Sequence, residues 1–179
     1  MRSLRRLLNA GRRAAVAFAT RQDGGPATEF ALVAPIFIVV VYATVQCAII
    51  YICNAYLETG AEEAARQVLT NQSSSLTTAQ FKTAVCNNMP ALFNCASVMV
   101  GLQPATSMTS ISTVSPTFNS DGTLAGTLPY QQPSPGQIGV LQVMYQWPVI
   151  GLPLGWNFAN MGNGTYLMMS TQVFRVEPQ

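Results

Sequence analysis

The stretch GGPATEFALVAPIFIVVVYATVQCAIIYICNAYL, residues 24–57, decides the architecture of this chain. From Phe30 to Leu57 no side chain carries a charge. A membrane-spanning helix needs ~20 apolar residues at ~1.5 Å each, so the run is long enough for one span. An ordinary anchor does not need the residues before it: Glu29 directly precedes the apolar run, and a Gly-Gly-Pro turn and an Arg-rich leader precede Glu29.

The charges are distributed unevenly about this run. Six of the nine Lys and Arg residues precede Gly24, whereas the remainder of the chain holds three basic and six acidic side chains. Cytoplasmic flanks of membrane spans are rich in Lys and Arg, so we expect a cytoplasmic N-terminus and a C-terminal part outside the cytoplasm. No basic patch follows the leader, and the sequence therefore does not predict nucleic-acid binding.

Composition restricts the class of protein further. Of 179 residues, 49% are hydrophobic and only 9% are charged, whereas ~25% is usual for a soluble domain. Histidine is absent, which removes most metal sites and most acid–base or nucleophilic triads. The chain also lacks a Gly-rich phosphate loop and a G-x-S-x-G elbow. We therefore expect a protein that is not an enzyme and that needs neither cofactor nor metal.

The basic leader, residues 1–23, has two alternative interpretations. Arg-rich and without an acidic residue before Asp23, it resembles a mitochondrial transit peptide, but a complete membrane span follows it. A secretory signal fits less well, because its apolar region is normally ~7–15 residues long.

The four cysteines form two pairs. Cys47 and Cys53 lie within the apolar run, six residues apart and on different faces of a helix, and are interpreted as small apolar fillers. Cys86 and Cys95 lie in the part expected outside the cytoplasm, where oxidation is favoured, so we predict a disulfide between them.

Two helices are expected. The apolar stripe continues beyond the span through Leu57, Ala61, Ala64, Ala65 and Val68, which predicts one helix from about Thr28 to about Thr70. A second, shorter helix is predicted to be capped by Thr77 or Thr78, to end before Pro90, and to bury Phe81, Val85 and Met89.

Strands follow the second helix, where apolar residues begin to alternate. The ranges predicted as strands are 98–102 (ending before Pro104), one stretch near 110–118 inside a mobile excursion over 104–137, 138–147 and 166–176. The apolar loop 148–164, with Leu152, Leu154, Trp156, Phe158 and Met161, is expected to fold over the core, with a binding surface as the alternative. The fold class is thus α+β: a long transmembrane and stalk helix, then a small domain with a short helix and a three- or four-stranded antiparallel sheet.

The junction from Gly24 to Phe30 resembles a type IV pilin-like processing site: a basic leader, a glycine, glutamate five residues later, then an apolar helix. The sequence EFALVAP, residues 29–35, is similar to the TadE/TadG-like family of bacterial tight-adherence (Tad) pili. Weaker similarities are the outer cysteines, YQWP at 145–148 and VFRVEP at 173–178.

This resemblance implies a minor pilin or pseudopilin that acts in pilus assembly, priming or capping. A membrane prepilin peptidase would cut between Gly24 and Gly25, while Glu29 and Phe30 would serve recognition and assembly. Pro26 is a departure that affects cleavage efficiency. Three regions follow: a leader (1–24), a transmembrane and stalk helix (25–70) and an extracytoplasmic domain (71–179).

The partners implied are the prepilin peptidase, other pilins of the same system, the inner-membrane assembly platform and membrane lipid. The location implied is the bacterial inner membrane, with a periplasmic C-terminal domain, or the extracellular pilus after assembly. The competing interpretation is an uncleaved single-pass protein whose outer domain binds a partner or the cell wall.

Overall fold

The computed structural model describes residues 25–70, 76–151 and 155–178. The chain divides into two compact units, Met1–Ala43 and Thr44–Gln179. Helix α2, Gly25–Leu69, begins in the first unit and ends in the second. It starts three residues earlier than predicted from Thr28, because Pro26 is well tolerated in a first helical turn, where backbone N–H groups have no intrahelical acceptor.

Within the second unit, α2 buries one stripe of side chains and exposes the rest. The stripe recurs every three or four residues, as a helix packed on one side requires. Its members are Gln46, Ile50, Cys53, Leu57, Gly60, Ala61, Ala64, Ala65 and Val68. The predicted face from Leu57 to Val68 is thereby confirmed. The small residues allow a close approach: a Cβ on Gly60 would lie 2.8 Å from Met89 Cγ.

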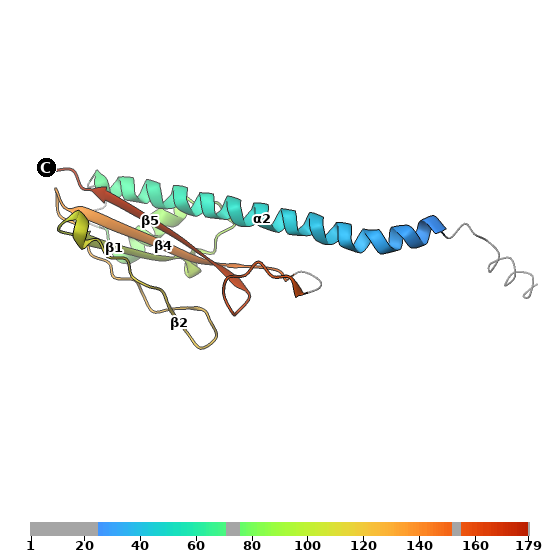
Figure 1. Cartoon of the computed structure of the whole chain (residues 1–179). Coiled ribbons are helices and arrows are strands. Elements are labelled where there is room, and N and C mark those ends of the chain that lie inside the picture. The colour runs from blue at the N-terminus through green and yellow to red at the C-terminus, as the bar shows by residue number, and fades with distance from the viewer. Residues whose placement is uncertain (1–24, 71–75, 152–154, 179) are drawn as a thin grey trace, which may run out of the picture. The chain divides into compact units, whose positions relative to one another are not determined.

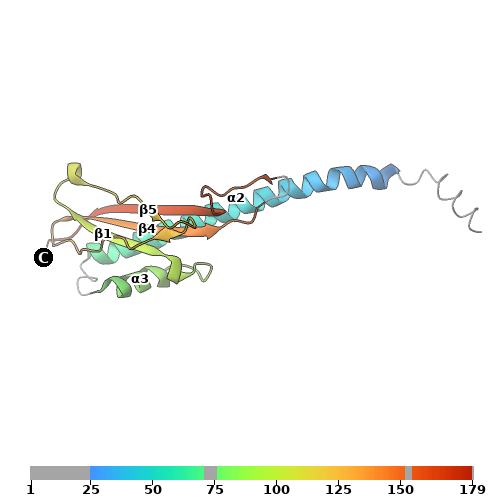
Figure 2. The same ribbon diagram turned by 90° about the horizontal axis from the view of Figure 1, so that it is seen from below.

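The second helix, α3, covers Thr78–Asn87, and a capping box stabilises its N-terminus. Thr77 is the N-cap, its side chain accepts from the Gln80 N–H, and the Gln80 side chain accepts from the Thr77 N–H at 2.9 Å. Phe81, Val85 and Met89 are buried as predicted. Helix α3 lies beside the C-terminal part of α2, and both contribute to one hydrophobic core (Figure 2).

A three-stranded antiparallel sheet completes this core. Its order is β1-β4-β5, with β1 at Met99–Ala105, β4 at Ile138–Pro148 and β5 at Thr165–Arg175 (Figure 1). Leu102 pairs with Leu141, and Leu141 with Gln172. Strands β2 (Thr117–Phe118) and β3 (Leu124–Ala125) form a separate two-stranded sheet. The α+β prediction is confirmed.

Two of the strand predictions need correction. Pro104 does not end the first strand, which continues to Ala105; since β1 is an edge strand of its sheet, a residue without an N–H is tolerated there. The strand expected near 110–118 is reduced to the two residues of β2, and a short 3₁₀ helix, Met108–Ser110, precedes it.

Strand β4 is buried from Ile138 to Tyr145, on both of its faces. One face carries Leu141, Val143 and Tyr145 into the core shared with the helices. The other face is covered by residues 111–126, and two glutamine side chains of β4 form hydrogen bonds to the backbone of that segment. The Gln142 amide accepts from Val114 N at 2.8 Å, and the Gln146 amide accepts from Leu124 N at 3.0 Å. These hydrogen bonds attach the segment between β1 and β4, which contains little regular structure, to the sheet.

A turn at Asp121-Gly122 joins β2 to β3. Gly122 adopts φ +78°, a conformation that favours glycine. Thr123 donates to Asp121 Oδ1 from its hydroxyl at 2.6 Å and from its backbone N–H at 3.0 Å, and these bonds hold the pKa of Asp121 below its ordinary value. The Gly122 carbonyl accepts from Gln146 Nε2 at 2.8 Å, which attaches the turn to the sheet.

Candidate functional site

The N-terminal end of α2 holds three of the residues that the sequence singles out. Gly25 is the first residue of the helix, whereas Gly24 lies outside the described residues. Thr28 Oγ1 donates to the Gly25 carbonyl at 2.8 Å. A Cβ placed on Gly25 would meet no atom within 4 Å, so nothing described crowds the backbone at this point.

Glu29 and Phe30 follow on the same helix, and both side chains are exposed. Phe30 is 74% exposed. Large apolar side chains continue on all sides of the helix in the first unit, which a soluble protein would bury. The exposed members are Leu32, Val33, Ile36, Phe37, Ile38, Val40 and Val41. A helix that is apolar all round needs lipid or other apolar helices around it.

In the described part of the chain, α2 is the one helix long and apolar enough to cross a membrane. It is consistent with a single-pass anchor by length and composition. Pro35 lies inside the helix, where its missing N–H leaves the Ala31 carbonyl without its usual helical donor. Such a site is tolerated in a membrane helix when neighbouring groups satisfy the carbonyl.

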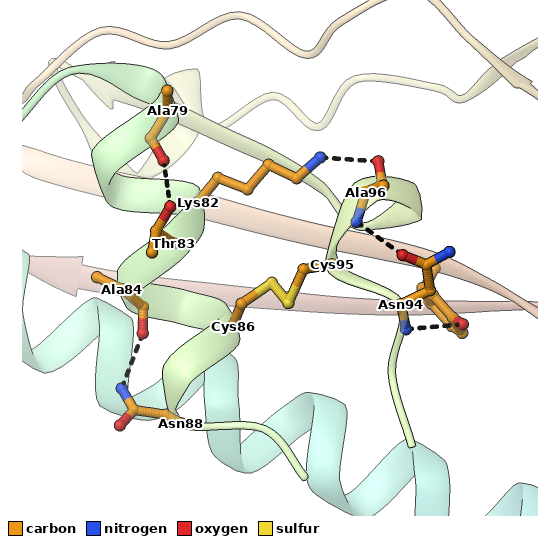
Figure 3. The surroundings of a disulfide bond; sticks show 10 residues. Ala79, Lys82, Thr83, Ala84, Cys86, Asn88, Asn94, Cys95 and Ala96 are labelled. Carbon is orange, nitrogen blue, oxygen red and sulfur yellow. Dashed lines mark hydrogen bonds between the residues drawn. A yellow bond between two sulfur atoms is a disulfide. The ribbon is translucent and has the colours of Figure 1, made fainter. Parts of the chain in front are cut away.

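The structure joins Cys86 and Cys95 in a disulfide, which supports the predicted pairing (Figure 3). Their Cα atoms lie 5.9 Å apart, within the usual range for a disulfide. The bond links the C-terminal turn of α3 to the short 3₁₀ helix Cys95–Ser97 that leads into β1. Cys47 and Cys53 remain free thiols.

Hydrogen bonds hold the same junction. Lys82 Nζ donates to the Ala96 carbonyl at 2.9 Å, and Asn94 Oδ1 accepts from the Ala96 N–H at 3.1 Å (Figure 3). The Asn94 backbone N–H donates to the Tyr145 hydroxyl at 3.3 Å. The disulfide therefore belongs to a network that attaches α3 to both β1 and β4, and its role is structural.

We expect the disulfide to be measurable by thiol counting. Denatured protein alkylated without reduction should carry two modified cysteines, Cys47 and Cys53, and four after reduction. Closing a loop of this length contributes about 2–3 kcal/mol in the chain-entropy model, so the Cys86→Ser, Cys95→Ser double variant should unfold at correspondingly lower denaturant. Four modified thiols before reduction would contradict the pairing.

A pocket of about 470 Å³ opens beside the start of β1. Lys82, Ser97, Thr123, Thr127 and Gln146 are among its lining residues. They come from α3, the 3₁₀ turn, the β2–β3 region and β4, so no local motif could mark the pocket in the sequence. No group of three His, Cys, Asp or Glu residues able to hold a metal occurs in the segments that the structure describes.

The apolar connection between β4 and β5 does not fold over the core as a whole, and this part of the loop prediction is wrong. Val149 and Phe158 pack against the core, but Ile150 is 68% exposed and Trp156 is 63% exposed. Leu152 and Leu154 lie outside the described residues.

Comparison with known proteins agrees with the resemblance at the N-terminus. No curated protein and no solved structure matches the chain significantly. A family model does match, and its extent corresponds to α2, from the first helical residue almost to the last turn. Residues 25–66 match the model of the TadE-like protein family, which confirms the predicted family resemblance over that segment.

Proposed function

We propose that this protein is a minor pilin or pseudopilin of a Tad-type pilus, made as a membrane precursor and trimmed by a prepilin peptidase between Gly24 and Gly25. The observation that carries the proposal is the helix that matches the TadE-like family: it starts at Gly25, presents Glu29, and then exposes apolar side chains on all sides. Its role is structural and not enzymatic.

The physical basis is that one surface suits two environments. A helix whose exposed side chains are apolar is soluble in lipid, and the same side chains can pack in a bundle of similar helices. The subunit can therefore leave the membrane for a fibre without refolding. The second unit supports this, because its own part of α2 supplies buried residues from Ile50 to Val68 to the core of the domain.

The proposed partners follow from this route: the peptidase, neighbouring pilins, the assembly platform and the lipid of the inner membrane. The proposed topology places the basic leader in the cytoplasm and the disulfide-containing domain in the periplasm. Intact mass of protein purified from its own membrane is the direct test. A chain of residues 25–179 supports the proposal, whereas a chain that keeps Met1 supports a static anchor.

Gly24→Val should abolish cleavage and leave membrane insertion unchanged. A β-branched side chain restricts the backbone and crowds the peptidase site, while insertion depends on the apolar run and the leader arginines. The measurement is the ratio of precursor to mature mass in the membrane fraction. Gly162→Val, distant from the junction and at a position where an added Cβ meets no atom within 4 Å, is the control and should be processed normally. A Gly24→Val chain trimmed at the wild-type rate would refute the assigned cleavage site.

A further inference from the structure

The β4–β5 connection carries an apolar surface that the proposed function does not use. Ile150 and Trp156, about two-thirds exposed, project from a loop whose neighbouring Val149 and Phe158 hold it to the core. Chain positions 122–174 contain no charged residue at all. The surface formed by Ile150 and Trp156, here called the loop surface, is therefore apolar and electrically neutral.

The position of this loop along α2 follows from the sheet. The Glu177 N–H donates to the Leu69 carbonyl at 3.1 Å, which joins the end of β5 to the end of α2. From Arg175 back to Thr165 the strand covers ~33 Å, a length that corresponds to ~22 helical residues. Strands β4 and β5 run beside the second-unit part of α2 (Figures 1 and 2), so the loop lies at the level of about Gln46 to Ile50.

Packing holds the loop to the same domain. Val149 and Phe158 contact the core cluster, to which α2 contributes buried residues from Ile50 onward. Together with the strand lengths, this places the loop surface at the end of the second unit that contains the beginning of its helix.

The outer boundary of a bilayer falls at this level too. If Glu29 lies at one headgroup boundary, a hydrocarbon core of ~30 Å takes up ~20 helical residues and ends near Ile49. Tyr51, 76% exposed, and Tyr56, 43% exposed, follow directly. Tyr and Trp concentrate at the membrane–water interface, where one part of the ring system is apolar and another is hydrated.

We propose that the loop surface inserts into the outer interface of the bilayer, with Trp156 and Ile150 among the headgroups and upper acyl chains. This inference rests on the membrane span of the proposed function. It gives the outer domain a second attachment to lipid beside its own helix, one that must be released when the subunit leaves the membrane. Because the loop surface has no charge, insertion should not require anionic lipid or depend on salt.

Trp fluorescence can test this in the full chain, which contains only Trp147 and Trp156. The Trp147→Phe variant is reconstituted in zwitterionic vesicles whose acyl chains carry bromine near the headgroup. Trp156 should lose about half of its emission, because an interfacial side chain lies ~5–10 Å into the boundary where the bromines are. If Trp147→Phe does not fold, the loss of Trp156 emission is obtained from the difference in lipid quenching between wild type and Trp156→Phe.

A matched control reports from the other end of the sheet. Met108 is 69% exposed and follows β1 at the end where Ala105 pairs with Ile138 and Ile138 with Arg175. With both native tryptophans replaced by Phe, Met108→Trp should show no quenching by brominated lipid and full quenching by acrylamide. Equal lipid quenching at the two positions would overturn the inference.

The result also separates this inference from the proposed function. Resistance to alkaline extraction shows whether the chain is integrated in the vesicles. An integrated chain whose Trp156 is unquenched overturns the loop insertion alone, and shielding of Trp156 by a co-purified subunit instead would assign the loop surface to a protein partner. A chain that is not integrated overturns both.

Discussion

Phe81→Ala should unfold the outer domain at a much lower temperature than wild type. Phe81 is fully buried, and its ring centroid lies 5.6 Å from that of Tyr130. Truncation of a buried Phe costs about 3–5 kcal/mol, which is a large part of the ~5–15 kcal/mol that stabilises a typical domain. At about 2–4 °C per kcal/mol for a chain of this size, the midpoint should fall by about 6–20 °C.

The loss is large because Phe81 connects three parts of the core. Phe81 of α3 belongs to the same core cluster as the buried residues of α2. Tyr130, its aromatic neighbour, donates to the Leu76 carbonyl at 3.3 Å and belongs to the segment that bridges to Leu102 of β1. Near-ultraviolet circular dichroism of the full chain in detergent measures the transition. Leu92→Ala, at a side chain 61% exposed, is the control and should change stability by less than about 0.5 kcal/mol. Equal midpoints for the two variants would contradict the core described here.

Glu29→Gln should leave processing and membrane insertion intact but nearly abolish association with partner pilins. A carboxylate at the edge of hydrocarbon costs several kcal/mol unless it is paired. No Lys or Arg occurs between Arg21 and Arg66, so removal of the leader leaves no basic side chain nearby in the sequence. The proposed cleavage after Gly24 would supply a substitute, the new amino group of Gly25.

The helix makes this pairing geometrically reasonable. Since α2 begins at Gly25, Glu29 lies four residues later and on the same face, so the amino group can come from its own chain or from a neighbour alongside. Removal of one member of a buried pair leaves the other charge uncompensated, which is strongly destabilising and penalises a wrong axial register. The opposing interpretation is that Glu29 only stabilises the helix N-terminus among headgroups, by a few tenths of a kcal/mol.

Co-immunoprecipitation from detergent distinguishes the two interpretations. Glu58→Gln makes the same change of charge at an exposed position of the same helix, beyond the uncharged run, and should associate normally. Unchanged association of Glu29→Gln would reject the pairing role. A Glu29→Gln chain that is not cleaved would instead assign Glu29 to recognition by the peptidase.

The sequence by itself determined the elements with strong local signals. The uncharged run indicated α2, the Thr77-Thr78 pair indicated the start of α3, and the aromatic and β-branched residues of 138–147 and 166–176 indicated β4 and β5. These features depend on neighbours in the chain, through helix periodicity, capping and strand alternation. The family resemblance at the start of α2 could be found for the same reason, because its residues are contiguous.

Only the tertiary structure decided how the weakly patterned segments are held. Gln142 and Gln146 look like solvent-facing strand residues, yet their amides bind the backbone of the 111–126 segment because that segment covers the second face of β4. Trp156 looks like a core residue, yet it is 63% exposed, while Val149 and Phe158 of the same connection pack against the core. In both cases the environment of a side chain depends on residues distant in sequence, and local preference carries no information about them.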